Sequence, residues 1–133
     1  MATDDELAAC RRRLDRLRRH LEQEELGAAL LVRPEHLRYL AGHRPGGGPA
    51  ALVVTRSAAV LVAPSGVAAA EECAALGIDL VPYAAYDAGR LVDRAVRAYA
   101  ALGEVGRRLA LRGRVGVEAD NILHAAVRAV DAA

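Results

Sequence analysis

The stretch Ala28–Gly42, AALLVRPEHLRYLAG, sets the expected fold, because it predicts a buried strand that runs directly into a short helix. Ala28–Val32 is a continuous apolar run after Gly27, which is typical of a buried strand. Pro34 fixes a backbone angle suited to the first turn of a helix. Gly42 accepts the left-handed conformation that ends a helix without strain. The rest of the chain is expected to cover or flank this strand.

A long amphipathic helix is expected before the strand. Thr3 offers a capping hydroxyl, and three carboxylates follow it in the first turn. An apolar stripe with three- or four-residue spacing favours packing against a sheet; it comprises Leu7, Cys10, Leu14, Leu17 and Leu21. The arginines off this stripe alternate with acids, which predicts a solvated face with ion pairs rather than a nucleic-acid patch. Gly27 is expected to end the helix.

The segments after Gly42 predict an α/β domain. Two apolar runs, Ala50–Thr55 and Ala59–Ala63, are joined by Arg56-Ser57 and predict an antiparallel hairpin. The remaining segments alternate between helix and strand: helix Val67–Leu76, strand Ile78–Pro82, a helix from Gly89 to about Leu102, strand Arg114–Glu118 and a last helix capped by Asp120. Gly103 and Gly106 leave open a bend and a continuation over Val105–Leu111. We therefore expect one domain over residues 1–133, with a mixed β-sheet of five to six strands and helices on both faces.

Composition limits the partners and the compartment. The 133 residues carry a net charge of +1, which gives no support to a nucleic-acid or membrane partner. No apolar run approaches the roughly 20 residues that span a bilayer, and the N-terminus does not have the pattern of a secretion signal. Cys10 and Cys73 are expected to be free thiols in a reducing compartment. These features predict a cytoplasmic protein.

Four segments resemble the N-terminal domain of the creatinase/prolidase/Xaa-Pro aminopeptidase family of pita-bread metallopeptidases. Arg33–Gly42 is similar to the family segment P-x-N-x-x-Y-L-[TS]-G, with His36 in place of Asn and Ala41 in place of Thr or Ser. The opening helix RRRLDRLRRHLEQEELGAALLV, the hairpin ALVVTRSAAVLVAP and the strand RVGVEAD are similar to its other elements. On this resemblance the structural motif consists of Pro34, Tyr39, Leu40 and Gly42, and Tyr39 is expected to bury its ring under the sheet.

The resemblance implies that this chain is not itself an enzyme. In the family, a separate C-terminal domain holds a dinuclear metal site (manganese, cobalt or zinc) made by two aspartates, a histidine and two glutamates. This sequence has none of those motifs, so we expect no catalytic residue, cofactor or metal in it. The expected role is dimer contact and narrowed access to the neighbouring active site, with a homodimer and, if the gene is longer, a C-terminal catalytic domain as partners. The alternative is a stand-alone interaction or scaffold domain, or a biosynthetic accessory domain, without the catalytic half.

His43 and Arg44 are the candidates for substrate contact. In the family, residues after the Tyr-Leu-x-Gly segment project toward the neighbouring subunit's active site, where an arginine helps to hold a substrate carboxylate. The alternative is a solvated arginine in an arginine-rich chain. The loop His43–Pro49, HRPGGGP, does not fit a phosphate cradle, because it follows a helix, leads into a strand and has no lysine.

Glu118 and Asp120 form the remaining acidic pair. They lie two residues apart on a strand-to-helix turn. We expect them to cap the last helix rather than to act as an acid and a base.

Overall fold

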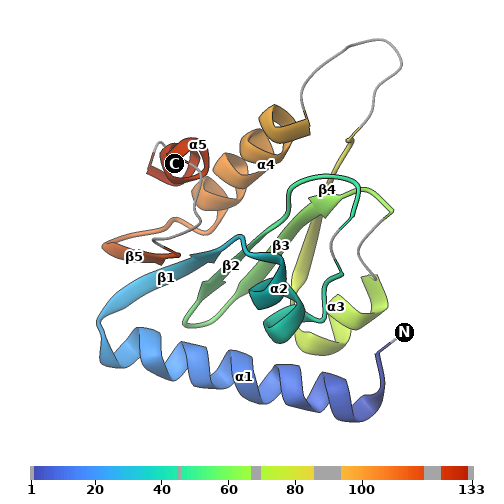
Figure 1. The fold of residues 1–133 in the computed structure, drawn as a ribbon. Helices are drawn as coiled ribbons and strands as arrows, with labels where there is room; N and C mark the ends of the chain where they lie inside the picture. Colours follow the sequence, from blue (N-terminus) through green and yellow to red (C-terminus); the bar gives the residue numbers. More distant parts are fainter. Residues whose placement is uncertain (1, 45, 67–69, 86–93, 119–123, 132–133) are drawn as a thin grey trace.

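The computed structural model describes residues 2–44, 46–66, 70–85, 94–118 and 124–131 (Figure 1). The described elements in chain order are α1 (Asp4–Gln23), β1 (Leu26–Leu31), α2 (Pro34–Ala41), β2 (Ala51–Thr55), β3 (Ala59–Pro64), α3 (Ala70–Leu76), β4 (Asp79–Tyr83), α4 (Arg94–Arg108), β5 (Arg114–Val117) and α5 (His124–Asp131). The predicted residues 67–69, the start of the helix from Gly89, and Asp120 lie outside the described residues.

The described strands form one mixed sheet in the order β4-β3-β2-β1-β5. β2 pairs antiparallel with both β1 and β3, which confirms the predicted hairpin. The outer pairs, β1 with β5 and β3 with β4, are parallel. Helices α1, α2 and α3 cover one face and α4 and α5 the other (Figure 1). The predicted mixed sheet with helices on both faces is confirmed.

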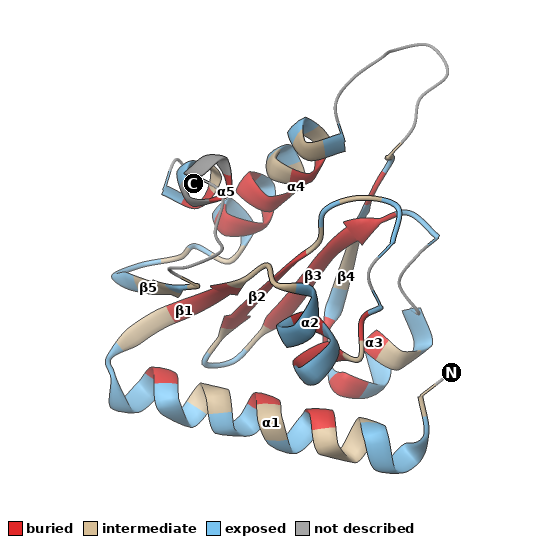
Figure 2. Ribbon diagram, viewed as in Figure 1, coloured by how far each residue is buried: buried red, intermediate tan, exposed pale blue. Residues whose placement is uncertain are grey.

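The central strands are buried on both sides (Figure 2). Along β2, Leu52 and Val54 belong to the core under α1, α2 and α3, whereas Ala51 and Val53 belong to the core under α4 and α5. Because successive side chains of a strand point to opposite faces, a strand covered on both faces needs a continuous apolar run. This explains why the runs in the sequence predicted these strands correctly.

Helix α1 ends earlier than predicted. Thr3 and Glu6 form the N-terminal capping box, but the helix stops at Gln23, and Glu25 adopts a positive φ of 55°. Gly27 lies inside β1, and a Cβ there would come within 2.2 Å of the Arg112 carbonyl oxygen. The prediction that Gly27 ends α1 is therefore wrong, because this glycine permits a close backbone approach inside the sheet instead.

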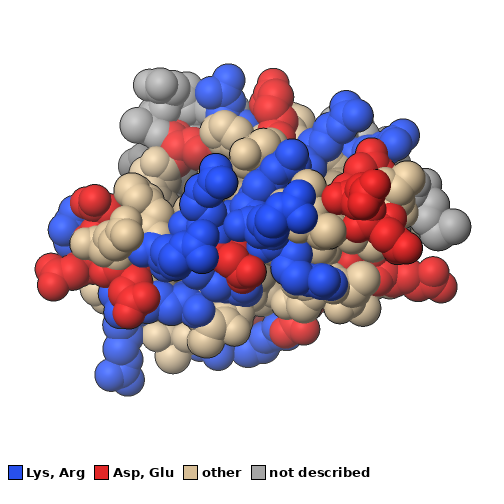
Figure 3. Space-filling view, turned by 90° about the horizontal axis from the view of Figure 1, so that it is seen from below, with Lys and Arg blue, Asp and Glu red and all other residues tan. Residues whose placement is uncertain are grey.

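The arginines of α1 mainly fasten the helix to its neighbours. Arg11 donates to the Ala75 carbonyl oxygen at 2.7 Å, Arg13 to that of Tyr39 at 2.9 Å and Arg18 to that of Thr55 at 3.4 Å. Within the described part of the chain, α1 makes one arginine–carboxylate ion pair, between Arg18 and Asp15. Figure 3 shows basic side chains across the middle of this face and acidic ones toward its two sides. The prediction of a face laced with ion pairs is thus only partly correct.

Helix α4 runs without interruption through two glycines. It spans Arg94–Arg108, so it continues past Gly103 and Gly106, the continuation that the sequence left open. A Cβ at Gly103 would lie 3.2 Å from the Ala129 carbonyl oxygen of α5. Gly103 therefore allows the two helices to approach closely. No helix among the described residues is long and apolar enough to cross a membrane.

Candidate functional site

Helix α2 positions the candidate residues, and its two ends follow local sequence rules. Pro34 occupies the first turn, where its missing N–H costs nothing. Gly42 adopts φ 65° and donates to the Arg38 carbonyl oxygen at 3.0 Å. The left-handed turn ends the helix and directs His43 and Arg44 away from its axis.

Tyr39 lies on the outer side of α2. Leu37 and Leu40 are buried, but 49% of Tyr39 is exposed. The Arg13 guanidinium stacks 4.0 Å from the centre of the Tyr39 ring. Since each helical residue turns the side-chain direction by about 100°, positions 37 and 40 face the core and position 39 cannot share that face. The prediction of a Tyr39 ring buried under the sheet is wrong, and the ring instead helps to hold α1 against α2.

Glu118 binds the backbone of the two residues that lead from β1 into α2. Its carboxylate accepts hydrogen bonds from the backbone N–H groups of Val32 at 2.8 Å and Arg33 at 2.9 Å, and it also bonds to Nδ1 of His36. Because β5 runs parallel to β1, the end of β5 lies beside the point where β1 leads into α2. The turn that Glu118 and Asp120 were expected to cap lies outside the described residues, so that part of the prediction stays a prediction.

The environment of Glu118 keeps it ionised. Burial by itself raises the pKa of this carboxyl, but the hydrogen bonds from Val32, His36 and Arg33 outweigh burial and hold the pKa below its ordinary value. Its side chain is only 9% exposed. An ionised carboxylate with one oxygen bound by two backbone donors and the other by a histidine ring is a structural anchor rather than a proton donor.

His43 and Arg44 are adjacent but have opposite environments. His43 is 5% exposed, and its Nε2 has no hydrogen-bond partner among the described atoms. Burial lowers the pKa of His43, so its ring is neutral at neutral pH. Arg44 is exposed. Hydrogen bonds from Thr3 lower the pKa of Glu6, and the charge of Arg44 adds to this effect, which places Arg44 near the start of α1.

The loop that follows Arg44 is fastened at its far end. The Arg94 guanidinium donates to the Gly47 carbonyl oxygen at 3.0 Å. The Tyr83 hydroxyl donates to the Pro49 carbonyl oxygen at 2.5 Å. Arg44 therefore lies between the glycine-capped end of α2 and a loop segment that Arg94 and Tyr83 bind.

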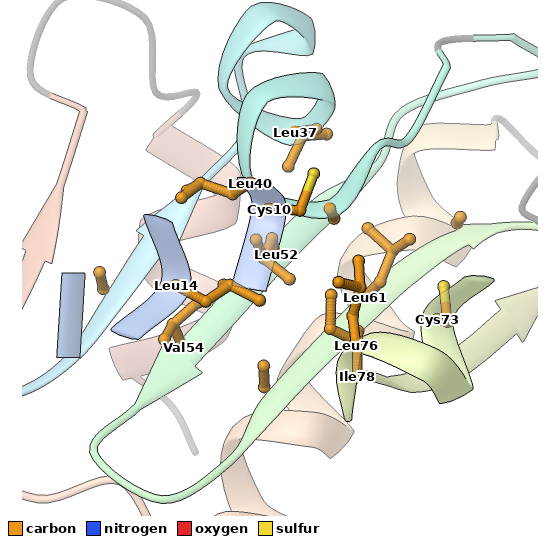
Figure 4. Close-up of a cluster of buried hydrophobic side chains, with 14 of the residues drawn as sticks. Cys10, Leu14, Leu37, Leu40, Leu52, Val54, Leu61, Cys73, Leu76 and Ile78 are labelled. Atoms are coloured by element: carbon orange, nitrogen blue, oxygen red, sulfur yellow. The ribbon is translucent and has the colours of Figure 1, made fainter. Parts of the chain in front are cut away.

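A cavity of about 840 Å³ opens between α1, α2 and α3, and both candidate residues line it. Its floor includes Cys10 of α1, Leu61 of β3 and Cys73 of α3, which are buried and come from three different elements (Figure 4). A second, mainly apolar cavity of about 310 Å³ lies toward α4, and His43 borders it as well. Sequence reasoning identified neither cavity, because each depends on elements far apart in the chain.

The described residues offer no metal centre. No group of three or more His, Cys, Asp or Glu side chains among them could hold an ion. Cys10 and Cys73 are free and buried. Burial, and to a lesser degree the nearby Glu72, raises the pKa of Cys73, so its thiol is a poor nucleophile and a poor ligand at neutral pH.

Known proteins share this architecture. The model of the creatinase/prolidase N-terminal domain matches residues 13–133. The dipeptidase PepE from Mycobacterium ulcerans aligns with a TM-score of 0.68 and 20% identity, over 98% of this chain and 34% of that chain. The Xaa-Pro dipeptidase from Bacillus anthracis aligns with a TM-score of 0.65 and 16% identity, over 92% of this chain and 30% of that chain. The N-terminal domain of the cytoplasmic peptidase PepQ from Mycobacterium tuberculosis H37Rv aligns with a TM-score of 0.61 and 20% identity, over 90% of this chain and 82% of that chain.

The extents of these matches define the unit. The chain spans about a third of the length of the two dipeptidases and most of the isolated N-terminal domain. No match is found among curated proteins. At identities near 20%, the structural likeness shows the fold, while the family model covers all but the first twelve residues. This chain therefore belongs to the creatinase/prolidase N-terminal domain family.

Proposed function

We propose that this chain is the non-catalytic N-terminal domain of a metal-dependent Xaa-Pro aminopeptidase or dipeptidase. Membership of the family supports this proposal. So does the match to about one third of two longer dipeptidases, which leaves the rest of those chains for other domains. The dinuclear metal centre would belong to the C-terminal domain. PepQ, described as a cytoplasmic peptidase, supports a cytoplasmic location.

The proposed role is to form dimer contacts and to restrict access to the neighbouring subunit's active site, with Arg44 touching the substrate. The observation that carries this role is the placement of Arg44. It is exposed and follows a helix whose start is anchored by Glu118 and whose end is fixed by Gly42. An exposed guanidinium can bind a carboxylate through two parallel hydrogen bonds. His43 is buried next to Arg44 in the chain and would act in this role as a positioning residue.

Kinetics of Arg44→Ala in the two-domain enzyme test this role. Hydrogen bonds to charged groups contribute about 1.5–3 kcal/mol, so kcat/KM for a dipeptide with a free carboxylate should fall roughly 10- to 100-fold. The same dipeptide as its C-terminal amide should be cleaved equally by both proteins. Arg12→Ala, on the outer face of α1, is the matched control and should leave kcat/KM unchanged for both substrates. Equal losses for both substrates, or no loss for either, contradict the role of Arg44.

The natural reading frame tests the domain assignment separately. A frame that continues past Ala133 into the metal-ligand motifs of a catalytic domain supports it. A stop codon at that point contradicts it and favours the stand-alone interaction domain. Light scattering tests the proposed homodimer, which a monomer at high concentration would contradict.

A further inference from the structure

We infer that the cavity of about 840 Å³ between α1, α2 and α3 binds a small zwitterion, namely a free amino acid or a short peptide with both termini unblocked. The inference shares Arg44 with the proposed function but does not depend on it. It follows from the distribution of paired and unpaired charges around the cavity.

The α2 side of the cavity carries unpaired positive charge. Arg38 and Arg44 both line it, and both are exposed. In the described part of the chain neither forms an ion pair or a side-chain hydrogen bond. Arg13 also lines the cavity, but its guanidinium is engaged by the ring and the carbonyl oxygen of Tyr39. Two guanidinium groups are therefore available for a carboxylate on this wall.

Most carboxylates around the cavity are already occupied. Glu6 accepts from the Thr3 N–H at 2.7 Å, and Glu72 accepts from the Ala2 N–H at 2.5 Å. Glu35 lies 3.8 Å from the Arg33 guanidinium. Glu71, in the first turn of α3, lines the opposite wall and has no such partner among the described residues. The cavity thus presents Arg38 of α2 and Arg44 just after it, with the Arg44 charge also acting on Glu6, and it presents one available anion, Glu71, on α3.

The space between the two walls suits a small organic molecule. Its floor is formed by the buried side chains of Cys10, Leu61 and Cys73 (Figure 4). The volume falls within the usual range of about 300–1,000 Å³ for small-molecule sites. A simple anion would bind to Arg38 and Arg44 but would leave Glu71 without a partner. A zwitterion places its carboxylate against Arg38 and Arg44, its ammonium against Glu71 and its aliphatic part over the floor.

Titration of the purified chain with alanyl-alanine tests the site. We expect saturable binding with a Kd on the order of 1 mM, measured by chemical-shift changes in amide NMR spectra. Alanyl-alanine amide has no carboxylate, N-acetyl-alanyl-alanine has no ammonium, and acetate has only the carboxylate. Each should bind at least about fivefold more weakly, since each loses a charge-assisted contact. No saturable binding of alanyl-alanine, or equal binding of the blocked peptides or of acetate, overturns the inference.

Substitutions separate the two walls. Arg38→Gln and Arg44→Gln should each raise the Kd for alanyl-alanine about five- to tenfold. Glu71→Gln should raise the Kd for alanyl-alanine but leave the Kd for N-acetyl-alanyl-alanine unchanged. Arg12→Gln, on the outer face of α1, is the control and should bind like the wild type. Unchanged binding in both arginine variants overturns the inference. Because this chain is assayed alone, the outcome is independent of the Arg44→Ala kinetics, which test only the proposed function.

Discussion

Replacement of Glu118 by glutamine is expected to destabilise the domain by about 2 kcal/mol at pH 7. The Glu118 carboxylate accepts from the N–H groups of Val32 and Arg33 and bonds to His36. It therefore joins the end of β5 to the junction of β1 and α2. Glutamine has nearly the same shape, but it carries no charge, and with its oxygen toward the two backbone donors its NH₂ group would face His36 Nδ1.

The magnitude follows from the number and the burial of these bonds. A hydrogen bond to a charged group contributes about 1.5–3 kcal/mol, and the Glu118 side chain is 9% exposed. With its amide oxygen in the place of Oε2, glutamine keeps both backbone bonds, but each then goes to a neutral acceptor and is weaker by about 1 kcal/mol, which brings the expected loss to about 2 kcal/mol. For a domain of this size that corresponds to a fall in Tm of roughly 6–10 °C. Glu35→Gln removes a carboxylate from a solvated side chain and should stay within about 0.5 kcal/mol.

The pH dependence distinguishes this anchor from an ordinary packing contact. The pKa of Glu118 in the folded state lies below its ordinary value of 4.5. Its contribution to stability is therefore present above that ordinary value and is lost as the pH falls through the lowered folded-state pKa. Urea unfolding from pH 7 downward should show a full gap in unfolding free energy between wild type and Glu118→Gln near neutrality, and the gap should narrow as the pH falls below 4.5 and through the lowered folded-state pKa. No gap at pH 7, or a gap that does not narrow in acid, refutes the reasoning.

Two further predictions concern the sheet and the core. Gly27→Ala should lower the free energy of unfolding by about 2–3 kcal/mol, because the new Cβ would lie 2.2 Å from the Arg112 carbonyl oxygen. Gly116→Ala on β5 should lower it less, because the nearest neighbour of its Cβ is the end of a flexible leucine side chain at 3.3 Å. Thermal unfolding measures both, and equal losses contradict the prediction. Cys10 and Cys73 are 5% and 3% exposed. Their thiols should react with Ellman's reagent only slowly until guanidinium unfolds the chain, and rapid labelling of the native protein contradicts their burial.

Features set by adjacent residues were predictable from the sequence. Pro34 and Gly42 fix the ends of α2 through their own backbone angles. The hairpin of β2 and β3 followed from two continuous apolar runs, because both strands are covered on both faces. The sequence therefore predicted the sheet and its two covering layers.

Features that depend on distant neighbours were not predictable in the same way. Glu118 binds the backbone just before α2 because β5 lies beside β1, a pairing between residues more than 80 positions apart. Gly27 is a glycine because the Arg112 carbonyl approaches it across that same pairing. Tyr39 could have been placed outside by strict helical spacing, since it lies two residues from Leu37, but its partner Arg13 comes from another helix. The charged walls of the cavity likewise come from three separate helices.

A peptidase assay on the purified chain tests most directly the proposal that this domain has no reactive centre of its own. The chain would be incubated with an Xaa-Pro dipeptide such as alanyl-proline and with added manganese or cobalt, and the release of free proline would be measured. We predict no release above that of a matched sample without the chain. Metal-dependent release that rises in proportion to the chain concentration, and that persists through a second, independent purification, would contradict the proposal.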